Sequence, residues 1–334
     1  MRHVTKTRNA GKSLSSICPE PGGTTGRTRI IAHRGASGYL PEHTAEAKAL
    51  AYGLGVDFIE QDIVATKDHE LVVLHDITLD DVSDVRMHFP DRRRDDGHYY
   101  VIDFTLAELD EISLLERRAT GSDERQFPGR FPYDLPVFKI SCFEDEVRLL
   151  SGLNASTGRH VGIYPEIKDP GWHAAAGVDL TALVHDTLEA NRELISGPVF
   201  IQSFDANALH RLRQEFTTSL PLVQLLGREE AEALGQEPNR ISAIAAYASG
   251  VGLPFATLME PEMVNGRLGA TRLARLLIDS ELVIHPYTMR RDVAIPAQAS
   301  YVETLRFLIH ELEVDALFCD HPDDALAIRD GKAV

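Results

Sequence analysis

The chain has 334 residues, and its 34 lysine and arginine residues against 51 aspartate and glutamate residues give a formal net charge of −17. Apolar residues make up 43% and charged residues 25%, which is a globular composition and excludes a wholly disordered chain. The acidic excess excludes an extended nucleic-acid surface, which needs clustered lysine and arginine, but it still permits a locally basic pocket for a small phosphate ester.

The first 27 residues are rich in glycine, serine, threonine, lysine and arginine without periodicity, which predicts a flexible N-terminal tail. We expect residues 28–330 to form one domain. No apolar run follows the basic N-terminus as it would in a signal peptide, and no stretch approaches the roughly 18 apolar residues of a membrane span. A cytoplasmic location is therefore expected, and a periplasmic or secreted one is the alternative if a leader is missing from this sequence.

Strand-like apolar runs alternate with helical patterns from residue 28 onwards. The first strand is predicted over 28–33 and is followed by an alanine-rich helix over 44–52. The next two strands, 56–64 and 70–75, are so close in the sequence that they form a hairpin-like pair. The remaining predicted strands are 160–167, 199–204, 220–226, 282–287 and 316–320, and the remaining helices are 143–150, 178–190, 205–215, 269–277, 301–311 and 322–328.

This succession of strands and helices predicts a parallel sheet with right-handed crossovers. The predicted strands number eight when 70–75 is counted, while 250–254 is a ninth candidate that is too short to assign. Eight strands favour a closed TIM (β/α)8 barrel over an open doubly wound sheet.

Residues 76–135 interrupt this alternation and are too long for an ordinary βα loop. A capping box, Thr105 with Glu108, predicts a short helix inside them. We predict that 76–135 forms a small subdomain inserted after the third strand, where it helps to form the substrate pocket. A surface excursion without a functional role is the alternative.

Three acidic residues are predicted at the mouth of the barrel, where parallel strands present the side chains that do chemistry. Glu60 and Asp62 are two residues apart in the second strand and so face the same way, and Glu166 ends the fourth. Three carboxylates together would repel one another unless a cation lay between them, and oxygen ligands suit Ca²⁺ or Mg²⁺ better than Zn²⁺. The alternative is that Glu60 and Asp62 simply pair with basic neighbours.

Two histidines and two cations complete the predicted site. His33 and His75 end the first and third predicted strands and are candidates for a general acid and base, since histidine titrates near neutrality. A structural, hydrogen-bonded role is the alternative for each. Arg34 and Lys168 would supply positive charge for an anionic substrate. Such a set of groups suits phosphoryl transfer on a phosphate ester.

An ordered series of short motifs runs through the chain. The motifs are HRGASGYLPEHT (33–44), EQD (60–62), LHD (74–76), YPEIK (164–168), QSFD (202–205), HPYT (285–288) and CDHP (319–322), with FPDR (89–92) and FPGRFP (127–132) inside the insertion. This series resembles the glycerophosphodiester phosphodiesterase family, and in particular its long bacterial branch of periplasmic type. The resemblance extends from residue 29 to about residue 329, and the order of the motifs makes it specific although each motif is weak alone.

The resemblance implies a TIM-barrel enzyme that hydrolyses glycerophosphodiesters, such as glycerophosphocholine or glycerophosphoethanolamine, to sn-glycerol 3-phosphate and an alcohol. It implies attack by the glycerol 2-hydroxyl on phosphorus, followed by opening of a cyclic phosphate. One divalent cation is implied, with Ca²⁺ expected in this branch and Mg²⁺ as the alternative. The implied roles are acid and base for His33 and His75, metal ligation for Glu60, Asp62 and Glu166, and phosphate binding for Arg34 and Lys168.

The role of His43 and the size of the substrate each need a separate interpretation. The family more often has asparagine at the position of His43, and we expect His43 to orient its neighbours. The alternative function is hydrolysis of larger glycerophosphate esters, such as a teichoic-acid chain or a lysophospholipid, on the same barrel. A non-enzymatic phosphate-binding protein is disfavoured, because both histidines and all three carboxylates are present.

The expected partner is thus a small-molecule glycerophosphodiester. Neither a nucleic acid nor a transmembrane segment is expected. The sequence leaves the choice between monomer and homodimer open.

Overall fold

The structure is a computed structural model that describes residues 27–263, 266–296 and 299–334. Apart from Arg27, the predicted tail lies outside these residues. Eight parallel strands form one sheet in the order β8-β7-β6-β5-β4-β2-β1-β9. The sheet closes where Met289, just after β8, pairs with Cys319 of β9. The strands are β1 (Arg29–Ala32), β2 (Phe58–Ala65), β3 (Leu71–Val73), β4 (Gly162–Ile167), β5 (Ile201–Ser203), β6 (Leu222–Leu225), β7 (Gly250–Pro254), β8 (Val283–Tyr287) and β9 (Ala316–Cys319).

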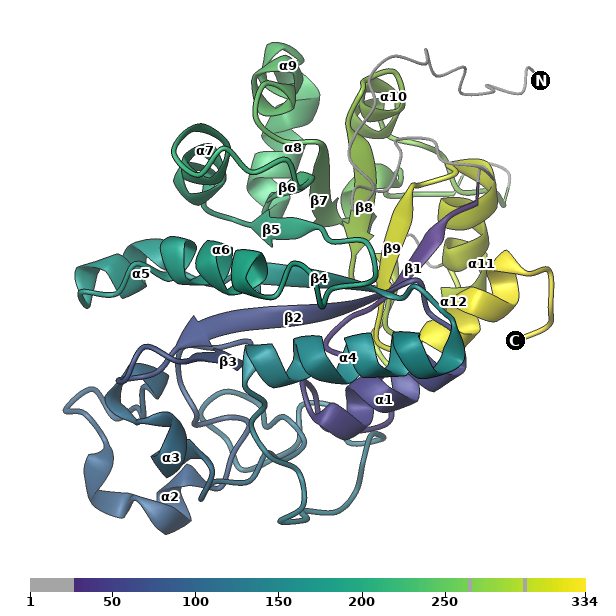
Figure 1. Cartoon of the computed structure of the whole chain (residues 1–334). Helices are drawn as coiled ribbons and strands as arrows, with labels where there is room; N and C mark the ends of the chain where they lie inside the picture. Colours follow the sequence, from purple (N-terminus) through teal and green to yellow (C-terminus); the bar gives the residue numbers. More distant parts are fainter. Residues whose placement is uncertain (1–26, 264–265, 297–298) are drawn as a thin grey trace.

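Helices surround the strands, as Figure 1 shows, so the predicted barrel architecture is confirmed. Among the described residues, no helix is both long and apolar enough to cross a membrane. The helices are α1 (Ala45–Leu54), α2 (Val85–His88), α3 (Leu106–Leu109), α4 (Phe143–Thr157), α5 (Pro170–Ala175), α6 (Leu180–Ala190), α7 (Ala206–Gln214), α8 (Arg228–Gln236), α9 (Asn239–Ala245), α10 (Arg272–Ile278), α11 (Tyr301–Arg306) and α12 (Pro322–Arg329).

The identity of one barrel strand was predicted wrongly. β3 pairs only with β2, in antiparallel orientation, and lies outside the barrel. The eighth barrel strand is β7, the glycine-rich segment that seemed too short to assign. A Cβ atom on Gly250 would lie 2.3 Å from the side chain of Val283, so glycine lets these two strands approach closely. Glycine has a low β propensity, so the sequence of β7 does not by itself predict a strand. Pairing with the neighbouring strands stabilises it in the folded protein.

A layer of apolar, mostly aromatic side chains fills the barrel interior below the site. Its members are buried and include Tyr164, which stacks on Phe200 with ring centroids 5.1 Å apart. Side chains two positions further along a strand point to the same side, one layer closer to its carboxyl end. The resulting pairs of layer residue and polar residue are Ile31 and His33, Phe58 and Glu60, Tyr164 and Glu166, Phe200 and Gln202, and Phe318 and Asp320.

The predicted insertion, residues 76–135, has an apolar core of its own. Phe104 is fully buried there, and its core continues onto the β2–β3 hairpin through Val64 and Val72. The expected capping box is present, because Thr105 accepts from the Glu108 backbone N–H and the Glu108 carboxylate accepts in return. Figure 1 shows α2 and α3 beside the arrowhead of β2, which is the carboxyl end of that strand.

One acidic side chain inside the insertion is buried without full compensation. Glu116 is buried, and its Oε2 atom has no hydrogen-bond partner among the described residues. Burial raises the pKa of this carboxyl to about 8, with Arg130 opposing the shift and Glu42 adding to it. The folded protein therefore keeps Glu116 protonated at neutral pH, whereas an unfolded chain would ionise it.

We predict that the insertion core contributes to stability. Replacement Phe104→Ala removes a fully buried ring and should lower the free energy of unfolding by about 3–5 kcal/mol, the usual cost of such a cavity. Denaturant titration measures this loss. Met87 in the same segment is 82% exposed, so Met87→Ala should leave the midpoint unchanged and serves as the control. Equal denaturation midpoints for the two variants would mean that Phe104 does not lie in a packed core.

We also predict that Glu116 makes stability fall with rising pH. Between the ordinary pKa of 4.5 and a folded value of about 8, the folded state binds the proton and the unfolded state does not. Stability should therefore be lost across this range, by at most about 5 kcal/mol. Glu116→Gln should match the wild type near pH 5 and exceed it above pH 8 in denaturant titrations. Glu124→Gln is the exposed control, and an unchanged difference between Glu116→Gln and wild type at both pH values would contradict the prediction.

Candidate active site

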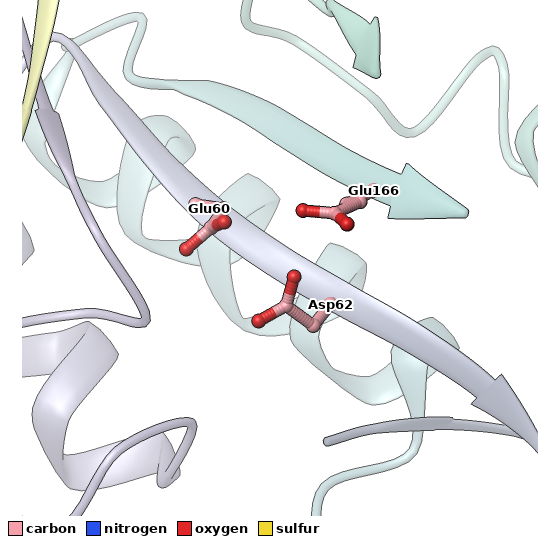
Figure 2. Close-up of side chains that lie close together, drawn as sticks. All are labelled: Glu60, Asp62 and Glu166. Atoms are coloured by element: carbon pink, nitrogen blue, oxygen red, sulfur yellow. The ribbon is translucent and has the colours of Figure 1, made fainter. Parts of the chain in front are cut away.

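Three carboxylates converge on one side of two neighbouring strands. Figure 2 shows Glu60 and Asp62 on β2 and Glu166 on the adjacent β4, with their carboxyl groups close together. Asp62 and Glu166 are direct partners in the parallel register. One oxygen from each of the three groups lies within 4.8 Å of the others, and all three residues are buried. The three acids predicted to meet at the barrel mouth therefore do meet.

These carboxylates are electrostatically strained as a group. Burial, together with the Asp62 charge, raises the pKa of Glu60 well above its ordinary value. Burial likewise raises the pKa of Glu166 to about 7, although the Lys168 ammonium opposes this shift. Burial also acts on Asp62, but Lys168 and His43 outweigh it and hold the pKa of Asp62 well below its usual range. The surroundings thus favour the charged form of Asp62 and disfavour the charged forms of Glu60 and Glu166.

The cluster fits a divalent cation. The Oδ1 atom of Asp62 is buried and has no hydrogen-bond partner within the described part of the chain, so it has an unused acceptor. Glu60 and Glu166 offer further oxygens within reach of the same point. An all-carboxylate set suits a hard ion, and such an ion would relieve the repulsion that raises the two glutamate pKa values. Glu60, Asp62 and Glu166 could therefore hold a metal ion.

His33 follows β1 and is buried beside the end of β9. Its Nδ1–H donates to Asp320 Oδ1 at 2.6 Å. This bond leaves Nε2 as the ring nitrogen for any proton transfer. Burial, followed by the nearby Arg34 charge, lowers the pKa of His33 to about 4, against the opposing effect of Asp320. The imidazole is neutral near pH 7 in this environment.

His75 repeats the arrangement after β3. Its Nδ1–H donates to Asp76 Oδ1 at 2.6 Å, and its side chain is 33% exposed. Burial and the charges of Arg34 and Lys168 lower the pKa of His75. Each of the two predicted acid–base histidines therefore has its Nδ1 atom held by an aspartate and its Nε2 atom left for chemistry.

The two predicted cations both lie against the carboxylate cluster. Lys168 Nζ donates to Glu166 Oε1 at 2.8 Å. Arg34 donates its backbone N–H to Glu60 Oε2 at 2.7 Å, and its guanidinium pairs with Glu42 at 3.0 Å. The backbone turns sharply at these residues, because Arg34 and Gly35 both have positive φ angles, of 59° and 83°. Position 35 requires glycine, since a Cβ atom there would lie 2.8 Å from the carbonyl carbon of Ala47. Both charges are thus fixed beside the cluster.

His43 is buried beside Asp62, between that carboxylate and the Lys48 ammonium. Its Nε2–H donates to Asp62 Oδ2 at 2.8 Å, and its Nδ1 accepts from Lys48 Nζ at 3.2 Å. Burial and the Lys48 charge lower the pKa of His43 to about 3, so the ring stays neutral. Lys48 also reaches the backbone carbonyl of Glu60 and pairs with Glu146 at 3.3 Å. His43 therefore contacts a metal-ligand candidate directly, which fits the expectation that it orients its neighbours.

Sequence reasoning assigned no role to several residues that complete this network. Gln202 on β5 donates to Glu60 at 3.3 Å, and Lys48 is a buried cation in a helix that looked merely alanine-rich. Two arginines of the insertion, Arg117 and Arg130, contact the aspartates behind the two histidines. Arg130 lies within the FPGRFP motif. This motif indicated the branch of the family but did not indicate which residues Arg130 contacts.

His285, the first residue of the HPYT motif, lies on β8 inside the barrel. Its Nδ1 atom is hydrogen-bonded to the Tyr164 hydroxyl at 2.7 Å, and its ring packs edge-on against Phe200. The residue is buried in the layer that forms the floor of the site. It therefore belongs with the aromatic layer and not with the carboxylate cluster.

Comparisons with known proteins give a consistent result. The glycerophosphoryl diester phosphodiesterase family matches residues 33–324. A glycerophosphodiester phosphodiesterase of Haemophilus influenzae is 38% identical over 327 residues, which cover 90% of both chains. A second, from Treponema pallidum, is 35% identical over 332 residues, covering 90% of this chain and 91% of its own.

Solved structures share the fold at lower identity. A glycerophosphoryl diester phosphodiesterase homologue from Silicibacter pomeroyi has a TM-score of 0.67 at 21% identity, with 91% of this chain and 94% of that chain covered. A phosphodiesterase of Oleispira antarctica, solved in complex with the product sn-glycerol-3-phosphate, has a TM-score of 0.62 at 16% identity, covering 91% and 97%. Because the family match spans most of the chain and two relatives exceed 30% identity over 90% of it, the chain belongs to the glycerophosphoryl diester phosphodiesterase family and is an enzyme of that class.

Proposed function

We propose that this enzyme hydrolyses glycerophosphodiesters, such as glycerophosphocholine and glycerophosphoethanolamine, to sn-glycerol 3-phosphate and an alcohol, with His33 and His75 as the acid–base pair. One observation carries the assignment of roles: a buried cluster of three carboxylates with two histidines that are each oriented by an aspartate. The product named for the Oleispira antarctica phosphodiesterase, sn-glycerol-3-phosphate, supports the same substrate class.

We assign Glu60, Asp62 and Glu166 as the ligands of one divalent cation, with Ca²⁺ as the expected ion. When bound, the cation would supply positive charge to the phosphate oxygens and acidify a substrate hydroxyl. His43 and Gln202 would keep Asp62 and Glu60 in place, since each donates a hydrogen bond to one of these carboxylates. Two observations support this assignment: Asp62 Oδ1 has no hydrogen-bond partner among the described residues, and the pKa values of the two glutamates are raised.

The protons are moved by the two imidazoles. The neutral imidazole of one histidine takes the proton of the glycerol 2-hydroxyl at Nε2 as the hydroxyl oxygen attacks phosphorus. The other histidine, in its imidazolium form, gives its Nε2 proton to the departing alcohol oxygen. The cyclic phosphate so formed is opened by water, with the two histidines exchanging roles. Arg34 and Lys168 hold the phosphate oxygens, because their charges already lie beside the carboxylate cluster.

We predict that activity requires the cation. Glycerophosphocholine hydrolysis, followed as release of glycerol 3-phosphate, should stop in excess chelator and return when Ca²⁺ is added. Asp62→Asn and Glu166→Gln should weaken Ca²⁺ binding by at least about 10-fold in calorimetry, because each removes an anionic ligand. Glu111→Gln, at an exposed acid, should bind as the wild type does. Turnover that persists unchanged in chelator would disprove the metal assignment.

We predict that both histidines are needed for turnover but not for metal binding. His33→Ala and His75→Ala should each lower kcat by about 10²- to 10⁴-fold, the usual contribution of general acid–base catalysis. Calorimetric Ca²⁺ affinity and the melting temperature should change little, since neither ring is assigned as a ligand. His160→Ala, at an exposed histidine, is the control. Wild-type kcat in either active-site variant would remove that residue from the mechanism.

A further inference from the structure

The insertion, residues 76–135, contacts both histidine–aspartate pairs through one arginine each. Arg130 binds the aspartate behind His33, and Arg117 binds the aspartate behind His75. We infer that Arg117 and Arg130 are positioning residues through which the insertion sets the orientation of both acid–base histidines. The inference rests on the proposed function, because it takes His33 and His75 as the acid–base pair.

The guanidinium of Arg130 is fixed by several contacts in addition to its hydrogen bond with Asp320. Its Nη2 donates to Asp320 Oδ2 at 2.7 Å, whereas the other oxygen of Asp320 receives His33. Its Nε and Nη2 donate to Asp292 at 2.7 and 3.0 Å, and its Nη1 donates to the Ser37 carbonyl at 3.2 Å. The Phe127 ring lies 3.7 Å from the guanidinium carbon and covers its face. The FPGRFP motif thus builds a fixed, desolvated guanidinium behind His33.

Arg117 occupies the corresponding place behind His75. Its Nη1 donates to Asp76 Oδ2 at 2.6 Å, and the other Asp76 oxygen receives His75 Nδ1–H. Its Nε and Nη2 grip both oxygens of Glu42, at 2.9 and 2.6 Å. Glu42 in turn pairs with Arg34, one of the proposed phosphate-binding residues. Arg117 therefore joins His75 to the cationic side of the site.

Only a guanidinium can perform this task at either position. Each arginine binds two carboxylates at once with donors in a rigid planar fork, and a lysine ammonium cannot span both in that geometry. With both oxygens engaged, each aspartate has a fixed orientation, and so does the imidazole that donates to it. The insertion is therefore part of the catalytic geometry, which goes beyond forming the wall of a pocket.

The two positions differ in one respect that the test can use. Asp320 receives a second arginine, Arg290, at 2.9 Å, whereas Asp76 has only Arg117 among the described arginines. Loss of Arg130 therefore leaves Asp320 with one guanidinium, and loss of Arg117 leaves Asp76 with none. His75 is also the more exposed of the two histidines. Arg117→Gln should be the more damaging change.

The first experiment measures kcat and KM for glycerophosphocholine with saturating Ca²⁺. Arg117→Gln and Arg130→Gln should lower kcat by about 10- to 100-fold, the range seen for residues that orient catalytic groups, and leave KM within about threefold of the wild type. Arg117→Lys and Arg130→Lys should fail to restore kcat. The control is Arg118→Gln, which should keep wild-type kcat. It removes a neighbouring insertion arginine whose ion-pair partners among the described residues are Asp123 and Asp134.

The second experiment asks whether each arginine acts through its aspartate. Asp76→Asn and Asp320→Asn are combined with the matching glutamine variants in two double-mutant cycles. If Arg117 acts through Asp76, the double variant should lose no more kcat than Asp76→Asn alone, and the same holds for Arg130 with Asp320. Multiplicative losses within a pair would overturn the inference for that arginine.

Other outcomes are equally decisive. A rise in KM with unchanged kcat would mean that the arginine contacts substrate, and wild-type kcat in both glutamine variants would mean that the insertion does not position the histidines. A glutamine variant that fails to fold is replaced by its lysine variant and by the aspartate variants, whose melting and Ca²⁺ binding are checked first. If the wild type and Arg118→Gln are themselves inactive on glycerophosphodiesters, the proposed function fails, whereas loss of this inference alone leaves both active.

Discussion

The burial of three like charges at one point is the constraint on which the rest of the structure depends. One oxygen each of Glu60, Asp62 and Glu166 lies within 4.8 Å of the others, above a layer of buried apolar side chains in the barrel interior. In such surroundings, unpaired carboxylates take up protons or must be compensated by positive charge. Burial of three carboxylates at one point raises the pKa values of both glutamates, which is the direction expected when the neighbouring positive charge does not fully balance the cluster. A divalent cation is the chemical complement of that deficit.

Positive charges surround the carboxylate cluster and partly balance its negative charge. Lys168 and Arg34 lie beside it, and Lys48 lies beneath it with His43 between the ammonium and Asp62. The aromatic layer under the site excludes water, which strengthens each of these interactions. The insertion adds arginines behind the histidine–aspartate pairs. The site thus holds many charged groups of both signs in fixed positions. Fixed charges of this kind can stabilise the charge that develops on a phosphodiester during the reaction.

Part of this arrangement could be predicted from the sequence. Alternation with a period of two placed Glu60 and Asp62 on one face, and parallel topology placed Glu166 beside them, because carboxyl ends of parallel strands meet at one edge. The same reasoning failed for β7 and β3. A glycine-rich run carries little strand propensity, and an apolar run in a hairpin has the same local pattern as a barrel strand.

The sequence by itself therefore determined the barrel, the order of its motifs and the chemical types at the mouth. Only the tertiary structure decided which side chains act together, because Arg117, Arg130 and Asp320 approach the histidines from segments far apart in the chain. Local periodicity reports which face a residue occupies in its own element. It carries no information about a guanidinium from residues 76–135 that packs against the end of β9, since such contacts are set by how separate elements pack.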